Sequence, residues 1–173
     1  MSDLFIKTKK RLITNNIKPK KFEDFFFCWI TNVNTTEYLI NRNKIRIRKN
    51  LKSTKKINIL QHNNFIKNYK NLHRIDFVIV NEKKKIIGGV NLKKTIFGYE
   101  IGKFISNEKY LNKGIAKKAA IIFILYIKKF FNIKKIFSYT NKNNLRNIIL
   151  NLKLGFEISK LDKKFLLMSK KIK

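Results

Sequence analysis

The segment YLNKGIAKKAAIIFILY, from Tyr110 to Tyr126, joins a lone glycine to a long apolar stretch. Its apolar residues recur at helical spacing, which predicts a helix that begins near Ile115. Gly114 precedes this helix, and its missing Cβ allows a tight turn and a close approach to a ligand. Backbone N–H groups at a helix start, helped by Lys113, can bind an anion. A plain turn would look the same in this loop, so both interpretations stay open.

The segments around this helix predict a sheet. IDFVIV (Ile75–Val80) and KIIGGVNL (Lys85–Leu92) alternate in polarity and flank the polar turn NEKK, which indicates an antiparallel hairpin. FGYEIGKFIS (Phe97–Ser106) is expected to be a third strand beside it. KKIFSYTN (Lys134–Asn141) has the composition of a further short strand.

A second helix is predicted for NLRNIILNLKLG (Asn144–Gly155), since Asn at the start and Gly at the end match the usual capping asymmetry. FEISKL and KFLLMSK are expected to close the chain as a hairpin. Upstream, Leu4–Ile13 can form a first strand. Lys20–Ile30, with aromatic residues at helical spacing, is expected to be an amphipathic helix, and residues 31–72 are expected to contain another helix.

The predicted order of elements is β, α, α, β, β, β, α, β, α, β, β. Antiparallel strands followed by one strand–helix–strand crossover are typical of a mixed sheet. We therefore expect a single domain over residues 4–173, of class α/β (α+β), with a mostly antiparallel central sheet and helices on both faces.

The net charge is +31, which raises nucleic acid or an anionic membrane as a partner. Only 6 of the 41 basic residues are Arg, although Arg is the side chain best suited to bidentate phosphate recognition. The remaining basic residues are Lys, and the other abundant residues are Asn, Ile and Phe. All four residue types are encoded by A/T-rich codons. We interpret much of the charge as composition bias, and the alternative is a surface that binds polyanions.

The chain offers no obvious metal site and no membrane span. Cys28 is its single cysteine and has no metal-ligand companions, so no metal is expected. The longest apolar run, Ala119–Ile127, has nine residues, whereas a membrane helix needs about 20. The N-terminus lacks the apolar region of a signal peptide. We therefore expect a cytoplasmic protein.

Two motifs resemble signatures of the GNAT acyltransferase superfamily. LNKGIA (Leu111–Ala116) is similar to its acyl-CoA loop, Q/R-x-x-G-x-G/A, except that Leu111 replaces Gln or Arg. NLRNIILNLKLGF (Asn144–Phe156) resembles its second signature, N-x-x-S-x-x-x-Y-x-K-x-G-F. In this second motif Asn147 replaces Ser and Asn151 replaces Tyr.

Further segments, in the same order along the chain, resemble one subgroup of that superfamily. They are IKTKKRLI (Ile6–Ile13), FEDFFFCW (Phe22–Trp29), KKIIGGV (Lys84–Val90) and YEIGKFI (Tyr99–Ile105). This subgroup acetylates ribosomal-protein N-termini and amino-sugar nucleotides. The resemblance thus covers nearly the whole chain.

The resemblance implies direct transfer of an acetyl group from acetyl-CoA, as co-substrate, to a primary amine in one ternary complex. It implies that the pantetheine arm contacts backbone groups of one strand and that the pyrophosphate lies on the loop before the helix. The implied cofactor-binding residues are Phe104, Ile105, Leu111, Asn112, Lys113, Gly114, Ile115, Ala116 and Asn144. For Asn144, an ordinary helix cap is an equally good interpretation.

The resemblance also suggests catalytic residues. Glu100 is the candidate base, with a salt-bridged surface Glu as the alternative. The usual acid is missing, because neither Asn147 nor Asn151 can donate a proton as an acid. Three explanations stay open: Tyr139 or another hydroxyl serves as the acid, the thiolate departs through water, or the chain has lost activity and kept the fold.

By resemblance, Trp29, Asn32 and Tyr38 lie where the superfamily shapes its acceptor pocket, although for Trp29 a place in the core is the favoured interpretation. The acceptor is expected to be an amino-sugar nucleotide or a protein N-terminal amine. Two other functions stay open, a catalytically silent GNAT-like domain and a basic module that binds nucleic acid. The protein is expected to be a monomer or a homodimer.

Overall fold

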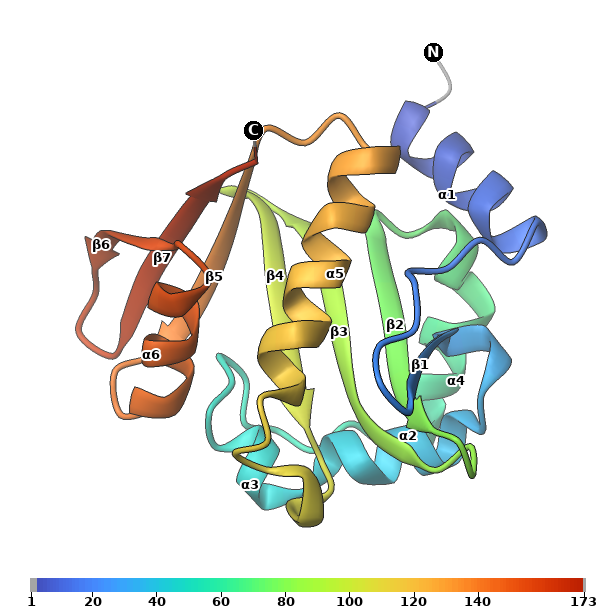
Figure 1. Cartoon of the computed structure of the whole chain (residues 1–173), viewed down its shortest axis with the longest axis horizontal. Coiled ribbons are helices and arrows are strands. Elements are labelled where there is room, and N and C mark those ends of the chain that lie inside the picture. Colours follow the sequence, from blue (N-terminus) through green and yellow to red (C-terminus); the bar gives the residue numbers. More distant parts are fainter. Residues whose placement is uncertain (1–2, 173) are drawn as a thin grey trace.

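The computed structural model describes residues 3–172 and is built on one seven-stranded sheet (Figure 1). The strands are β1 (Phe25–Trp29), β2 (Arg74–Asn81), β3 (Ile86–Thr95), β4 (Gly98–Ile105), β5 (Lys135–Asn141), β6 (Glu157–Leu161) and β7 (Phe165–Lys171). Their order across the sheet is β1-β2-β3-β4-β5-β7-β6, and only β4 and β5 run parallel. The predicted mixed, mostly antiparallel sheet is confirmed.

Helices cover both faces of the sheet. They are α1 (Leu4–Thr14), α2 (Thr35–Asn43), α3 (Ile45–Arg48), α4 (Ile59–Asn68), α5 (Ile115–Phe130) and α6 (Leu145–Lys153). Phe5 of α1 stacks on Tyr99 of β4, whereas Tyr38 of α2 meets Phe104 of the same strand. Because neighbouring residues of a strand point to opposite faces, α1 and α2 lie on opposite sides. Helix α5 lies on the same side as α1 and runs in front of β3 and β4 (Figure 1).

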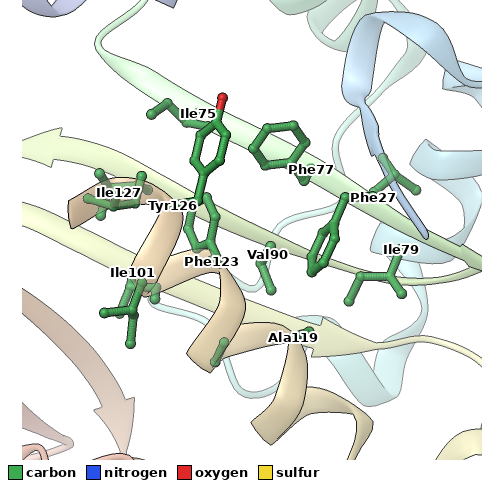
Figure 2. Close-up of a cluster of buried hydrophobic side chains, with 14 of the residues drawn as sticks. Phe27, Ile75, Phe77, Ile79, Val90, Ile101, Ala119, Phe123, Tyr126 and Ile127 are labelled. Atoms are coloured by element: carbon green, nitrogen blue, oxygen red, sulfur yellow. The ribbon is translucent and has the colours of Figure 1, made fainter. Parts of the chain in front are cut away.

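The apolar side of α5 packs on aromatic residues of the sheet. Phe77 of β2 meets Phe123 and Tyr126 of α5 edge-on, at centroid distances of 6.0 and 5.2 Å, as Figure 2 shows. Ala119, one turn earlier, is fully buried and lets the helix approach the sheet closely. This contact fixes the start of α5 relative to the strands, and therefore positions the loop around Gly114.

The predicted strand over Leu4–Ile13 is wrong, because this segment forms helix α1. Asp3 caps the helix by accepting a hydrogen bond from the backbone N–H of Phe5 at 2.9 Å. Phe5, Lys9 and Leu12 are buried together, and their spacing of four and three residues matches one helical face. A strand that buries Phe5 and Lys9 would also bury Lys7 between them, yet Lys7 is exposed.

The predicted helix over Lys20–Ile30 is also wrong, because Phe25–Trp29 forms edge strand β1. A short apolar run fits either structure by periodicity, and aromatic residues favour strands. β1 pairs antiparallel with β2, with Trp29 opposite Phe77, and alternate residues from Phe25 to Trp29 are buried. Glu23, within the predicted helix, has φ +48° and lies in a turn.

The remaining predictions agree more closely with the structure. The hairpin of β2 and β3, strand β4, helices α5 and α6, and the final hairpin of β6 and β7 are confirmed. The region 31–72, where a helix was expected, contains three helices and two short 3₁₀ turns. Asn58 begins α4 with a capping box shared with Gln61.

Candidate active site

Strands β4 and β5 run side by side at one end only and then diverge (Figure 1). Their pairing is limited to Tyr99 with Ile136 and Glu100 with Phe137. Beyond Glu100, the edge of β4 up to Ile105 has no partner on β5. A cavity of about 890 Å³ lies in this gap. It is lined by residues from both faces of the sheet.

The loop before α5 forms one wall of the cavity. Gly114 has φ +74°, the left-handed region that glycine adopts at little cost, and it caps the helix without any side-chain hydrogen bond. A Cβ placed on Gly114 would meet nothing within 4 Å, so the space in front of this residue is open. Free N–H groups of a helix start that faces open space suit an anion.

Helix α3 is tied to the end of β4 across the mouth of the cavity. Arg46 donates to the carbonyl oxygens of Ile105 and Ser106, at 3.0 and 3.3 Å. Lys44 donates to the same Ser106 oxygen at 3.1 Å. The Ile105 carbonyl, predicted to bind the pantetheine arm, is therefore already an acceptor for Arg46.

Glu100 lies where β4 and β5 begin to separate, and its side chain is 24% exposed. Its carboxylate forms an ion pair with Lys93 of β3, at 3.2 Å between Nζ and Oε2. Glu100 thus lines the cavity and is also salt-bridged, so the two interpretations of this residue hold together.

Tyr139 lies on β5 on the same face as Glu100. Its hydroxyl donates to Asp162 at 2.9 Å, and its ring stacks on Phe165. The hydrogen bond to the carboxylate is the main cause that raises the pKa of Tyr139. The phenol is therefore kept protonated, although its proton points toward Asp162.

A polar network lies on the other face, beneath α6. Asn151 is fully buried, and its amide N–H groups donate to Ser138 and Thr140, at 2.9 and 3.1 Å. Lys103 of β4 reaches across the gap and donates to Asn151 Oδ1 at 2.5 Å. Burial lowers the pKa of Lys103 to about 7. The cavity therefore contains an ammonium group that loses its proton near neutral pH.

The charged side chains lining the cavity are mostly basic: Arg46, Lys49, Lys103, Lys117 and Arg146, against Glu100. In a concave site, charges of one sign reinforce each other's field. The cavity therefore attracts anions and disfavours polycations.

Most of the predicted cofactor-binding and catalytic residues line this one cavity: Glu100, Phe104, Ile105, Leu111, Asn112, Gly114, Ile115, Ala116, Tyr139 and Asn144. Lys113 does not line it; its ammonium lies 5.8 Å from the centre of the Tyr110 ring. Asn144 caps α6 by accepting a hydrogen bond from the N–H of Asn147 at 3.3 Å. The expected capping role of Asn144 is confirmed.

The three residues predicted to bind the acceptor lie outside this cavity. Trp29 is fully buried against Phe77, with ring centroids 4.3 Å apart. Tyr38 is buried against Phe104, and Asn32 is exposed after β1. The core interpretation of Trp29 agrees with its burial, and a role of these residues toward the acceptor stays a prediction.

Sequence reasoning missed Lys103 and Arg46. A signal for Lys103 was present in the alternation of β4, where Ile101, Lys103 and Ile105 share the face that points into the fold. A lysine at an apolar position of such a pattern indicates a special environment. Arg46 had no comparable signal, because its segment follows no clear period.

Within residues 3–172, no three His, Cys, Asp or Glu side chains are grouped closely enough to hold a metal ion. In the same part of the chain, no helix combines the length and the apolar character needed to cross a membrane.

Solved structures of acetyltransferases have the same fold. The ribosomal-protein-S5-alanine acetyltransferase from Vibrio fischeri is 19% identical with a TM-score of 0.71, covering 89% of this chain and 96% of its own. The N-acetyltransferase PseH of Campylobacter jejuni is 22% identical with a TM-score of 0.64, covering 86% and 99%. An aminoglycoside acetyltransferase AAC(6')-Ib in complex with coenzyme A is 14% identical with a TM-score of 0.69, covering 85% and 94%.

A search of curated proteins finds no match in sequence. A family model described as the acetyltransferase (GNAT) domain matches residues 11–157, which include the whole β4–β5 cavity and the loop at Gly114. The chain therefore belongs to the GNAT family and is an acetyl-CoA-dependent N-acetyltransferase.

Proposed function

We propose that the protein transfers an acetyl group directly from acetyl-CoA to a primary amine, with both substrates bound together in the cavity between β4 and β5. The observation that carries this proposal is that residues from both faces of the sheet line one cavity, which is bounded by the start of α5 at Gly114. Holding two reactants in one geometry can by itself supply about 7–11 kcal/mol of the barrier.

In this proposal the first-turn N–H groups of α5 and Lys117 hold the pyrophosphate of acetyl-CoA, and the unpaired edge of β4 holds the pantetheine arm. The residues fit these groups, because Gly114 leaves open space before the helix and residues 101–105 have no partner on β5. Glu100 accepts the proton of the attacking amine, directly or through water, and its carboxylate is held in place by the ion pair with Lys93.

We propose an acceptor amine that carries negative charge, such as an amino-sugar nucleotide; the other expected acceptor is a protein N-terminal amine. The support is the charge of the cavity, where Arg46 and Lys49 of the α3 region stand against the single carboxylate of Glu100. A nucleoside diphosphate would complement these cations, and a polyamine would be repelled by them.

The cofactor site is tested with two variants of nearly equal shape. Gly114→Asn and Gly114→Asp both tolerate the left-handed backbone, so they share the same strain and differ only in charge. We expect acetyl-CoA at about 100 times its Kd to stabilise the parent by about 2.7 kcal/mol, because it binds only the folded state. Gly114→Asp should lose more of this thermal shift than Gly114→Asn. Equal shifts in the two variants would contradict an anion site at this loop.

The acceptor is tested by thiol release from acetyl-CoA with three amines: a nucleotide-linked amino sugar, a peptide with a free N-terminal alanine, and spermidine. We expect the nucleotide-linked sugar to give the highest kcat/KM, with a dependence on salt that reflects the basic cavity. Preference for spermidine would overturn the argument from charge. Preference for the peptide would assign the second expected acceptor.

A further inference from the structure

Lys103 lies at the point of the cavity where the proposed chemistry takes place, and this inference rests on the proposed function. CoA carries its phosphates at one end and its thioester at the other. If the phosphates lie at Gly114, the thioester extends along the unpaired edge of β4, among the residues that line the gap. Lys103 belongs to this edge and points to the face that α5 and α6 cover.

The ammonium group of Lys103 is held by a network with a fixed direction. Both N–H groups of Asn151 donate to hydroxyls, so its Oδ1 is left facing Lys103. Asn147 also donates to Thr140, at 2.9 Å, and so fixes the hydroxyl side of the network. An amide oxygen at 2.5 Å accepts a hydrogen bond from an amine, and two further N–H groups of a protonated Lys103 remain for other acceptors.

No acidic side chain neutralises this ammonium. Among the described residues Lys103 has no salt-bridge partner, and the single carboxylate of the cavity, Glu100, points to the opposite face of β4. The other charged residues that line the cavity are basic: Arg46 of α3, Lys49 directly after it, Lys117 of α5 and Arg146 of α6. Arg46 is itself paired with Glu108, at 3.6 Å. An anion that develops in the gap would therefore meet Lys103 as a proton donor that has no carboxylate partner.

We infer that Lys103 is the general acid that protonates the departing thiolate of CoA, with Asn151 as the residue that positions it. The alternative donor, Tyr139, directs its proton to Asp162 and lies on the other face of the sheet. Burial lowers the pKa of Lys103 to about 7, which suits an acid that must give up its proton near neutral pH.

The neutral acceptor amine forms a bond to the thioester carbon, the carbon–sulfur bond breaks, and its electron pair moves to sulfur. Lys103 gives one proton to the sulfur, which leaves CoA as the thiol and Lys103 as the neutral amine. The acceptor nitrogen loses one proton through Glu100 to solvent, and Lys103 regains one from solvent.

The first test needs no acceptor, because it measures the thiol of bound CoA. A cation beside sulfur lowers the pKa of a thiol. The ultraviolet absorbance of the thiolate is followed against pH for CoA bound to the parent, to Lys103→Met and to Lys103→Arg. The exposed Lys128→Met serves as the matched loss of one charge. We expect a thiol pKa below the usual value of about 8.5 in the parent and in Lys128→Met, and a higher one in Lys103→Met.

Turnover then separates proton donation from charge. Lys103→Arg keeps a cation, but a guanidinium does not give up its proton at these pH values. It should therefore keep the low thiol pKa and lose about 100-fold or more in kcat, as Lys103→Met should. In the parent, kcat should fall as the pH rises through the pKa of Lys103, and this decline should be absent in both variants.

Four outcomes decide between the alternatives. An unchanged thiol pKa in Lys103→Met would show that Lys103 does not touch the sulfur, and parental turnover in Lys103→Arg would show that it gives no proton; either overturns the inference. Loss of acetyl-CoA binding in Lys103→Met alone would make Lys103 a binding residue and also overturn it. A parent that binds no acetyl-CoA, measured directly by calorimetry, would instead refute the proposed function itself.

Discussion

A buried lysine outside the cavity, Lys9 of α1, is expected to make the stability of the protein depend on pH. Its side chain is fully buried, donates to the carbonyl oxygens of Tyr69 and Leu72, and lies 3.8 Å from the centre of the Tyr69 ring. Burial lowers the pKa of Lys9 to about 7, although Asp76 acts in the opposite direction. An unfolded lysine has a pKa of about 10.4.

The sign of the effect follows from these two values. Between pH 7 and 10 the unfolded chain binds more protons at Lys9 than the folded chain, so the free energy of unfolding rises with pH. The full slope is about 1.36 kcal/mol per pH unit. Lys9 is already half deprotonated at pH 7 in the folded protein, so its contribution from pH 7 to 9 is about 2 kcal/mol.

The assay is urea unfolding at pH 7, 8 and 9 for the parent, Lys9→Met and the exposed neighbour Lys10→Met. Lys9→Met leaves the carbonyls of Tyr69 and Leu72 without their donor, so it should be less stable than the parent at pH 9. The gap between parent and Lys9→Met should widen by about 2 kcal/mol from pH 7 to pH 9. The difference in the free energy of unfolding between the parent and Lys10→Met should stay constant over the same range. If the parent and Lys9→Met change in parallel, Lys9 is not the ionising group.

Substitutions at three glycines and one helix cap test the fold. Gly88→Ala would place a Cβ 2.1 Å from the backbone oxygen of Phe104 and should lower the free energy of unfolding by about 3 kcal/mol in urea, whereas Gly89→Ala, which meets a ring carbon at 3.1 Å, should cost clearly less. Asn58→Ala removes the capping box of α4 and should cost about 1 kcal/mol in the same assay. Gly155→Val should lower the melting temperature more than Gly155→Asn, because φ is +77°.

The sheet beyond residue 74 could be predicted from sequence because each strand there has its own local signal. β2 and β3 flank a polar turn, and α5 has a glycine start and a long apolar face. The first 30 residues lack such signals. Phe25–Trp29 is apolar at every position, so its period does not separate helix from strand, and only pairing with β2 decides it. The helical face of α1 includes Lys9, whose burial could not be expected from its residue type.

The site was predicted to a different extent. The loop at Gly114 and the end of β4 could be located, because they depend on backbone geometry that a few residues specify. The proposed proton donor could not be located from the sequence. It depends on the contact across the gap between Lys103 and Asn151, which are 48 positions apart. The residue type of Asn151 shows that it cannot act as an acid, but it does not reveal that Asn151 accepts a hydrogen bond from Lys103. The alternation of β4 marks Lys103 as a lysine at an apolar position, but its contact with Asn151 is set by tertiary packing and has no signal in the sequence.

The alternation of β4 explains how one strand can serve both halves of the proposed reaction. Glu100 and Lys103 are three residues apart, so they point to opposite faces of the sheet. Where two strands are paired, such residues are separated by backbone, and one substrate cannot touch both. The pairing of β4 with β5 stops at Glu100, and the gap beyond it joins the faces. A thioester held there can be attacked from the face of Glu100 while its sulfur leaves toward Lys103. The divergence of the two strands is therefore the feature that converts an alternating strand into an acid–base pair.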